Sequence, residues 1–299
     1  MTTVQPVRST DRLAPAEAAD VLALAAAADA ADGVYPLSED GVLHLRAVAP
    51  DGSRVHLLSA TEEGLAGYAY VDRSDAEGPS GELVVHPRHR RRGHGTALLA
   101  AAGPGHLRFW AHGDEPAARA FAEQAGFARS RVLWQMRRPL ADLPDVPLPD
   151  GVRVRSFVAG ADDEAWLGVN SRAFAHHPEQ GRWTADDLRM RMAEPWFDPA
   201  GFLLAVDPAD DRLLGFHWTK VHPAEGAEPA IGEIYVLGVD PGGHRRGLGA
   251  ALSVAGLRHL AGLGLSHALL YVDESNTAAV ALYRRLGFEI HSTDVMYSR

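Results

Sequence analysis

The 299-residue chain contains no cysteine. A disulfide, a thiolate zinc site and a cysteine nucleophile are therefore excluded, and so is a ping-pong mechanism that passes through an enzyme thiol. The absence of cysteine suits a cytoplasmic protein, because disulfides are mostly found in oxidising compartments. The sequence also lacks a long uninterrupted apolar run. Its nearest approach, VLALAAAADAA, is flanked by Glu17, Asp20 and Asp29, which predicts an amphipathic helix rather than a signal peptide or a membrane span.

Basic residues are outnumbered by acidic ones. The 29 Lys and Arg residues against 39 Asp and Glu give a formal net charge of −10, which argues against a nucleic-acid-binding protein, although arginine clusters can still form local positive sites. Hydrophobic residues make up 46% of the chain, enough to bury an ordinary core. The length suits two domains better than one.

Two basic, glycine-rich segments lie about half a chain apart. HPRHRRRGHGTALL begins at His86 and DPGGHRRGLGAAL begins at Asp240, an offset of 154 residues (240 − 86). A second matching pair follows: AEQAGF ends at Phe127 and YRRLGF ends at Phe288, an offset of 161 (288 − 127). Two landmarks in the same order at this distance indicate a duplicated domain rather than a short-period solenoid.

A proline-rich segment, RPLADLPDVPLPDG, separates the two copies. Proline disfavours helices and sheet pairing there. The sequence therefore predicts an N-terminal domain over residues 1–140, a linker over 141–150 and a C-terminal domain over 151–299. In each half a hairpin of strands precedes a strand, the glycine-rich turn, a helix, a strand, a second helix and a last strand. This order predicts an α/β fold with a mixed sheet in each half.

The turn before each helix contains the residue types of a phosphate-binding site. The first amides of a helix have no partner within it, and glycines such as Gly247 and Gly249 let them approach an anion closely. Arg245 and Arg246 add positive charge, so a pyrophosphate is the expected ligand. No lysine follows as in a P-loop, and Leu252 stands where a Rossmann motif has its third glycine. The alternative is an exposed basic turn that only caps the helix.

The segments HRRGLGAAL and NTAAVALYRRLGF resemble the two signatures of the GNAT family of acyl-CoA N-acyltransferases, with His244 in place of the usual Gln or Arg. The first copy, RRRGHGTALL, fits the loop signature as well. The resemblance covers both halves and implies a tandem GNAT protein that uses acetyl-CoA as cosubstrate. It implies that acetyl-CoA contacts Leu237, Gly238, Val239, His244, Arg245, Arg246, Gly247, Leu248, Gly249, Ala250, Asn276, Thr277, Ala278, Ala279, Val280 and Ala281 in the second half, and Leu83, Val84, Val85, Arg91, Arg92, Gly93, His94, Gly95 and Thr96 in the first.

The resemblance also implies two catalytic residues. Glu233 corresponds to the carboxylate that takes a proton from the amine, and Tyr283 to the phenol that protonates the CoA sulfur; a phenol suits that role because its pKa lies near that of a thiol. In the first half Ala122 aligns with Tyr283, and a shifted alignment offers Glu82 for Glu233. We therefore expect the first half to hold acetyl-CoA without turning it over. Each residue has an alternative role, Glu233 as an exposed strand residue and Tyr283 as a core aromatic.

Several strings, among them PLSEDGVLHLR and NSRAFAHHPEQGRWT, resemble a branch of the family that acetylates the cysteinyl amine of a cysteinyl-glucosaminyl-inositol. This implies that the acceptor contacts Glu39, Glu179, Lys220, Glu233 and Tyr271, with both halves contributing. We expect direct attack in a ternary complex, a monomer, and neither nucleic-acid nor membrane partners. The fifteen histidines form no HExxH motif, so no metal is expected. Two alternatives stay open: a tandem GNAT enzyme for another amine, such as an aminoglycoside or a peptide N-terminus, and a non-catalytic acyl-CoA sensor.

Overall fold

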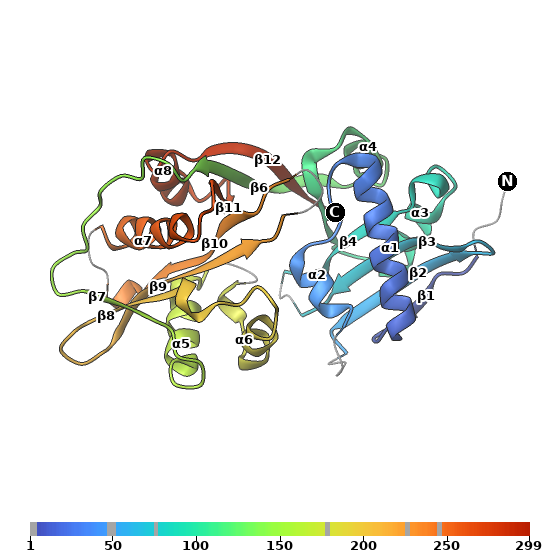
Figure 1. Ribbon diagram of the computed structural model, residues 1–299. Coiled ribbons are helices and arrows are strands. Elements are labelled where there is room, and N and C mark those ends of the chain that lie inside the picture. The colour runs from blue at the N-terminus through green and yellow to red at the C-terminus, as the bar shows by residue number, and fades with distance from the viewer. Residues whose placement is uncertain (1–4, 47–51, 75–76, 177–179, 225–227, 244–246) are drawn as a thin grey trace. The chain divides into compact units, whose positions relative to one another are not determined.

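The computed structural model describes residues 5–46, 52–74, 77–176, 180–224, 228–243 and 247–299 (Figure 1). The chain forms two compact units: unit 1 comprises Met1–Leu133 and Thr293–Arg299, and unit 2 comprises Trp134–Ser292. The proline-rich residues 141–150 thus lie within unit 2. Two strands, β6 (Ala128–Pro139) and β12 (Glu289–Ser298), each contribute residues to both units.

Unit 1 is built on a mixed sheet with the strand order β1-β2-β3-β4-β5-β12. Its strands before β6 are β1 (Arg8–Thr10), β2 (Arg54–Thr61), β3 (Gly64–Asp72), β4 (Ser80–Val85) and β5 (Arg108–Ala111). Strands β4 and β5 run parallel, and the end of β12 pairs antiparallel with β5, from Val295 opposite Ala111 to Ser298 opposite Arg108. The last residues of the chain therefore complete the sheet of unit 1.

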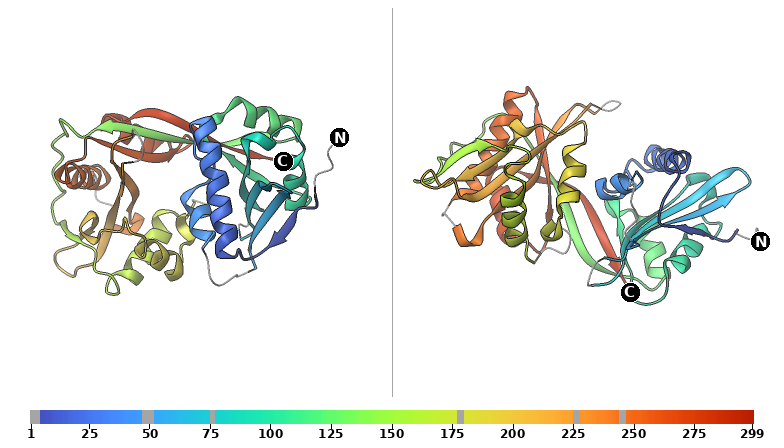
Figure 2. Two further views of the ribbon diagram at one scale, coloured as in Figure 1. Left: turned by 45° about the vertical axis from the view of Figure 1, so that its right-hand side comes forward. Right: turned by 90° about the horizontal axis from the view of Figure 1, so that it is seen from below.

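Helices cover both faces of that sheet (Figure 2). The helices of unit 1 are α1 (Pro15–Asp32), α2 (Glu39–His44), α3 (His94–Ala102) and α4 (Pro116–Gln124). One core joins α1 to Tyr68 and Tyr70 of β3, and a second core joins α3 and α4 to Leu57 of β2 and Ala69 of β3. Because successive strand residues face opposite sides, β3 supplies both cores.

Unit 2 has the strand order β6-β11-β10-β9-β8-β7. The strands that follow β6 are β7 (Arg153–Ser156), β8 (Phe202–Val206), β9 (Leu213–His222), β10 (Ile231–Val239) and β11 (His267–Asp273). The helices are α5 (Asp163–Ala173), α6 (Ala185–Met192), α7 (Leu248–Gly262) and α8 (Thr277–Arg285). Figure 1 shows α5 and α6 on one side of β9 and β10 and α7 on the other. An aromatic core around Trp166 and Trp218 lies on the α5 side, and an aliphatic core around Leu257 and Leu270 lies on the α7 side.

The start of α3 and the start of α7 have the same backbone geometry. Gly93 and Gly247 are the residues that precede these helices, with φ of 93° and 88°, a left-handed conformation that favours glycine. Two residues later, a Cβ on Gly95 would meet the ring of Phe121 at 3.1 Å, and a Cβ on Gly249 would meet Leu282 at 3.9 Å. Phe121 and Leu282 are themselves 161 residues apart (282 − 121). The duplicated mixed α/β fold predicted from the sequence is confirmed.

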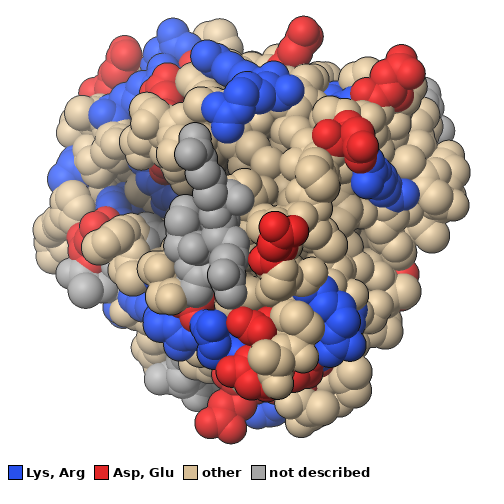
Figure 3. Space-filling model, turned by 90° about the vertical axis from the view of Figure 1, so that its left-hand side faces the viewer, with Lys and Arg blue, Asp and Glu red and all other residues tan. Residues whose placement is uncertain are grey.

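None of the described helices is long and apolar enough to cross a membrane. On the face drawn in Figure 3, basic and acidic side chains lie among one another over the described residues, without a broad surface of one sign.

Candidate functional site

Three neighbouring strands bring the predicted polar residues of unit 2 onto one face of the sheet. Glu233 on β10 is directly opposite Lys220 on β9 and Leu269 on β11. Ile234 packs in the core on the α7 side, so alternation directs Glu233 toward the side of α5 and α6. Tyr271, two residues beyond Leu269, faces the same way and is 44% exposed. The structure therefore places Lys220, Glu233 and Tyr271 together on this face.

Glu233 is 6% exposed and has a histidine partner. The His222 ring donates a hydrogen bond from Nε2 to Glu233 Oε2 at 2.6 Å. The two residues sit diagonally across the antiparallel pair, because His222 lies opposite Ile231. A carboxylate taken out of water needs such a donor, since burial otherwise disfavours its charged form.

Lys220 is the only lysine in the sequence, and it is 8% exposed. Its ammonium lies 4.6 Å from the ring centroid of Trp196 and 5.2 Å from that of Tyr235, within the range of cation–π attraction. The Tyr235 hydroxyl accepts a hydrogen bond of 2.9 Å from Arg191 Nε. Arg191 in turn stacks over Trp183 at 3.9 Å. The rings of Trp183, Trp196 and Tyr235 and the cations Lys220 and Arg191 thus lie together on the face that carries Glu233.

Strand β6 supports the exposed tyrosine of the site. Gln135 Nε2 donates a hydrogen bond to the Tyr271 hydroxyl at 2.7 Å, and Arg137 Nε donates to Gln135 Oε1 at 2.8 Å. Both residues of β6 lie in unit 2. The Tyr271 ring is therefore held at its polar end although its face is open to solvent.

Tyr283 lies on the α7 side of the sheet of unit 2, opposite to the side that Glu233 faces. It is on α8 and packs in the core on the α7 side, with its ring 5.8 Å from that of Phe288. Burial raises the pKa of Tyr283 to about 12, so its phenol keeps its proton throughout the physiological pH range.

The segment before α7 is where the sequence predicts the phosphate turn of unit 2. Asp240 Oδ1 accepts a hydrogen bond from the Gly242 amide at 2.9 Å, and Arg172 Nη2 donates to Asp240 Oδ2 at 2.7 Å. Hydrogen bonding to Arg172 holds the pKa of Asp240 below its usual value. The side chain that starts the turn is thereby fixed. Four predicted contacts lie outside the described residues: His244, Arg245, Arg246 and Glu179.

The other predicted cofactor contacts of unit 2 surround this turn. Strand β10 pairs with β11 from Gly232 to Ile234 and then continues along β9 alone to Val239. At the last residues of β10, which are Leu237, Gly238 and Val239, the backbone amides and carbonyls that face away from β9 are thus not paired with β11. Asn276 precedes α8, and its Oδ1 accepts a hydrogen bond from the Ala279 amide. Two of the predicted contacts, Leu248 and Val280, have side chains buried in the protein core, whereas Thr277, Ala278 and Ala281 are exposed.

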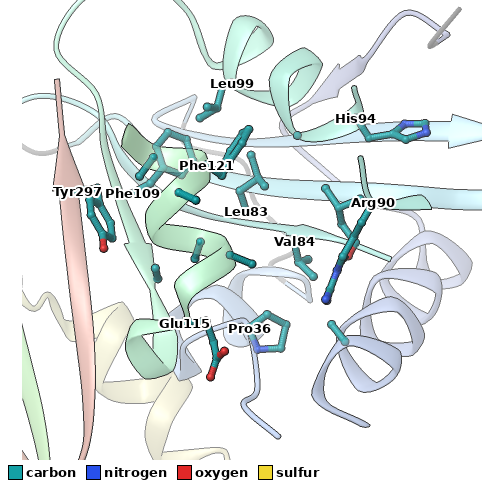
Figure 4. A pocket seen from close by; sticks show the side chains of 18 of the residues that line it. Pro36, Leu83, Val84, Arg90, His94, Leu99, Phe109, Glu115, Phe121 and Tyr297 are labelled. Atoms are coloured by element: carbon teal, nitrogen blue, oxygen red, sulfur yellow. Dashed lines mark hydrogen bonds between the residues drawn. The ribbon is translucent and has the colours of Figure 1, made fainter. Parts of the chain in front are cut away.

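Unit 1 contains a cavity of about 510 Å³ at the corresponding place (Figure 4). Strand β4 pairs with β5 only as far as Glu82, and the residues beyond it, Leu83 to Val85, line the cavity. Figure 4 shows Leu83, Phe109 and Phe121 in the middle of this cavity and Arg90 at one side. Of the contacts predicted for this half, all but Arg92 line it: Leu83, Val84, Val85, Arg91, Gly93, His94, Gly95 and Thr96. The volume lies within the usual range for small-molecule sites.

The loop beside this cavity is held by side-chain contacts. Arg90 pairs with Asp32 of α1 through two hydrogen bonds, and its Nε donates to the Val85 carbonyl. His94 Nδ1 is 2.9 Å from the hydroxyl of the buried Ser59. Burial lowers the pKa of His94, so the first residue of α3 is neutral at pH 7. Arg91 adopts a left-handed φ of 60°, which is uncommon for a residue with a side chain.

The carboxylate of β4 in unit 1 is enclosed. Glu82 is 3% exposed, and its Oε1 accepts hydrogen bonds from the Ser38 amide and from His112 Nε2. His112 Nδ1 lies 3.1 Å from Asp294 on β12. Burial opposes the charge of His112, but hydrogen bonds and ion pairs to Asp294 and Glu82 outweigh it and raise its pKa to about 10. Glu39, the predicted acceptor contact of this half, is the first residue of α2 and is half-buried.

The sequence did not reveal which side chains contact Glu233, Lys220 and Glu82. His222 was visible two positions after Lys220, a spacing that puts both on one face of a strand. Trp183 and Trp196 could be predicted only as core or cleft-wall aromatics without a chemical role, and Arg191 gave no signal, because all three come from segments before β8. His112 and Asp294 are separated by 182 residues, and no local pattern links them.

Both halves of the chain are similar to known acetyltransferases. The profile of the acetyltransferase (GNAT) family matches residues 170–288, and that of an acetyltransferase (GNAT) domain matches residues 52–129. The mycothiol acetyltransferase of Salinispora arenicola is 58% identical over 300 residues, covering 98% of this chain and 96% of the relative.

Two solved structures match over nearly their whole length. A GCN5-related N-acetyltransferase from Sphaerobacter thermophilus is 27% identical, with a TM-score of 0.68, and the match covers 100% of this chain and 96% of the other. A tandem GNAT protein from the clavulanic acid biosynthesis pathway is 21% identical, with a TM-score of 0.72 and 98% of each chain covered. At that identity the second match supports the fold alone.

Proposed function

This chain belongs to the GNAT family of acetyltransferases, within the group of the mycothiol acetyltransferases, and from that premise we propose that it transfers an acetyl group from acetyl-CoA to the cysteinyl amine of desacetylmycothiol. The product is mycothiol, so the reaction is the last step of its biosynthesis. The single observation that carries the choice of acceptor is the 58% identity to a mycothiol acetyltransferase over 98% of the chain. Acetyl-CoA supplies an activated acyl carbon as its thioester.

In this proposal unit 2 performs the chemistry. The amine of the acceptor is an ammonium ion in water and must lose a proton before it can attack. The Glu233 carboxylate, buried at the centre of the polar face, accepts that proton directly or through water. Lys220 on the opposite strand and Tyr271 on β11 are within the same face and contact the hydroxyl groups of the acceptor. The chain has no cysteine to carry the acyl group as an enzyme thioester, and in this proposal the amine attacks the thioester carbon directly.

Tyr283 provides the proton for the departing sulfur. The carbon–nitrogen bond forms as the carbon–sulfur bond breaks, and the phenol protonates the thiolate. A second proton from the amine nitrogen, passed through water, restores the phenol. Burial raises the pKa of Tyr283, so the phenol carries its proton at neutral pH. It hydrogen-bonds the leaving sulfur and passes on its proton as the amine proton arrives through water, so no free phenolate has to form.

We propose that unit 1 binds acetyl-CoA but does not turn it over. Its cavity and its left-handed Gly93 offer the binding surface, and Ala122 on α4 has no proton to give. The enclosed Glu82 supports the same conclusion, because both His112 and the Ser38 amide occupy its Oε1.

The test of the function is a comparison of acceptors. Purified protein is incubated with acetyl-CoA and with desacetylmycothiol, its des-cysteinyl glucosaminyl-inositol, an aminoglycoside or a short peptide, and the acetylated product is located by mass spectrometry. We expect acetylation of the cysteinyl amine of desacetylmycothiol with a kcat/KM at least about 100-fold above that of the other amines, which requires about 2.7 kcal/mol of discrimination. Equal efficiency across the panel would remove the specific assignment and leave a general amine acetyltransferase. The expected monomeric state and cytoplasmic location stay predictions.

A further inference from the structure

A second titratable side chain touches the proposed base. His222 is the last residue of β9, its side chain is 36% exposed, and its Nε2 lies 2.6 Å from Oε2 of Glu233, whose side chain is 8% exposed. One end of this pair is therefore in water and the other is inside the polar face of unit 2. None of the roles assigned so far uses His222.

We propose that His222 is a positioning residue for Glu233. The imidazole donates a hydrogen bond to Oε2, fixes the plane of the carboxylate and leaves Oε1 as the oxygen that takes the proton of the ammonium group. The inference rests on the proposed function of Glu233 as the base and goes beyond it, because it assigns the group that sets the orientation and the proton affinity of that base.

The surroundings of Glu233 make this donor important. On β11 the residue opposite Glu233 is the apolar Leu269, and on β9 it is Lys220. The Lys220 ammonium is drawn toward the rings of Trp196 and Tyr235, and the Tyr235 hydroxyl is engaged by Arg191. Among the described residues, the charged and titratable groups on this face are Lys220 of β9, Tyr235 of β10 and Tyr271 of β11, with Arg191 of α6 bonded to the Tyr235 hydroxyl. His222 makes the hydrogen bond of 2.6 Å to the carboxylate.

His222 influences proton transfer to Glu233 through its hydrogen bond and does not itself give up a proton in the reaction. A donor to Oε2 stabilises the ionised form of Glu233, so the carboxylate stays ready to accept a proton although it is buried. Removal of the donor leaves Oε2 buried without this hydrogen bond, which disfavours the charged form of the carboxylate and lets its plane rotate.

The experiment compares four variants of the full chain: His222→Leu, His222→Gln, Glu233→Gln and the control His267→Leu, an exposed histidine on β11. For each, kcat and KM are measured with acetyl-CoA and desacetylmycothiol between pH 5.5 and 9, and thermal unfolding is recorded. In His222→Leu we expect kcat to fall about 10- to 100-fold, part of the usual contribution of a general base. Its acidic limb should move to higher pH, with KM for acetyl-CoA within about twofold. His222→Gln, whose amide can donate to Oε2, should recover most of kcat, and His267→Leu should match the wild type.

Two results would overturn the inference while Glu233 stands as the base. One is a wild-type kcat and pH profile for His222→Leu beside an inactive Glu233→Gln. The other is an equal loss in His222→Leu and His222→Gln with an unmoved acidic limb and a lowered unfolding temperature, which is the behaviour of a structural residue. Wild-type turnover in Glu233→Gln would instead overturn the proposed base, and the role of His222 with it.

Discussion

The buried cluster of Glu82, His112 and Asp294 predicts that unit 1 loses stability as pH rises. The pKa of His112 is raised from 6.5 to about 10 in the folded protein, because the two carboxylates outweigh the effect of burial. A group whose pKa is higher in the folded state stabilises it fully below the unfolded value, here 6.5. That contribution is lost progressively as pH rises from 6.5 through about 10.

The size of the effect follows from the two pKa values. At 1.36 kcal/mol for each pH unit between them, the upper bound is about 4 to 5 kcal/mol. Removing one partner of a buried ion pair costs about 3 kcal/mol, so we expect a loss on the order of 3 kcal/mol across this pH range. A change of this size is a large part of the stability of an ordinary domain.

The assay is urea unfolding at pH 6.5, 8 and 9.5, combined with hydrogen exchange of peptides from β4 and β5 to follow unit 1 separately. The perturbation is His112→Gln, which removes the charge and leaves both carboxylates in place. The wild type should lose stability in unit 1 across this range, whereas the variant should start lower and change little. Parallel pH dependences for the two proteins would refute the reasoning, because the slope would then come from other groups.

Three further predictions concern the ligands. Gly247→Ala should strain a left-handed backbone by about 1 to 2 kcal/mol and raise KM for acetyl-CoA. Gly249→Ala, whose Cβ would meet no described residue closer than 3.9 Å, should unfold nearer the wild-type temperature. Gly95→Val should crowd the Phe121 ring, 3.1 Å from a Cβ, and lower the acetyl-CoA bound per chain from about two to one in calorimetric titration with kcat unchanged; a halved kcat would contradict a non-catalytic unit 1. Because Lys220 is the only lysine, desacetylmycothiol should protect a single side-chain amine from acylating reagents, and unchanged labelling would exclude it as an acceptor contact.

The duplicated fold was accessible from the sequence because its landmarks are backbone requirements. Gly93 and Gly247 stand at left-handed positions that other residues avoid, so their spacing is visible without a structure. The boundary between the units was not accessible. Residues 134–139 join the sheet of unit 2 and residues 293–299 that of unit 1, and both are ordinary strand sequences that carry no sign of which sheet they complete.

The polar face of unit 2 was predictable in part. Glu233, Lys220 and Tyr271 were expected from the resemblance, and the strand register brings them together. The hydrogen-bond partners around this face were not expected. Gln135, which donates to the Tyr271 hydroxyl, and Arg191, which donates to the Tyr235 hydroxyl, come from distant segments. Such contacts depend on tertiary packing, for which a periodic pattern in one strand gives no information.

The role proposed for Tyr283 as proton donor gives the most direct test of the account. Turnover of acetyl-CoA with desacetylmycothiol is measured for Tyr283→Phe beside the wild type, together with the acetyl-CoA dissociation constant. We predict that kcat falls by about 10²- to 10⁴-fold, the usual loss on removing a general acid, while the dissociation constant changes less than about twofold. A variant that keeps most of its turnover would contradict the account, and either unit 1 or another acid of unit 2 would then carry the reaction.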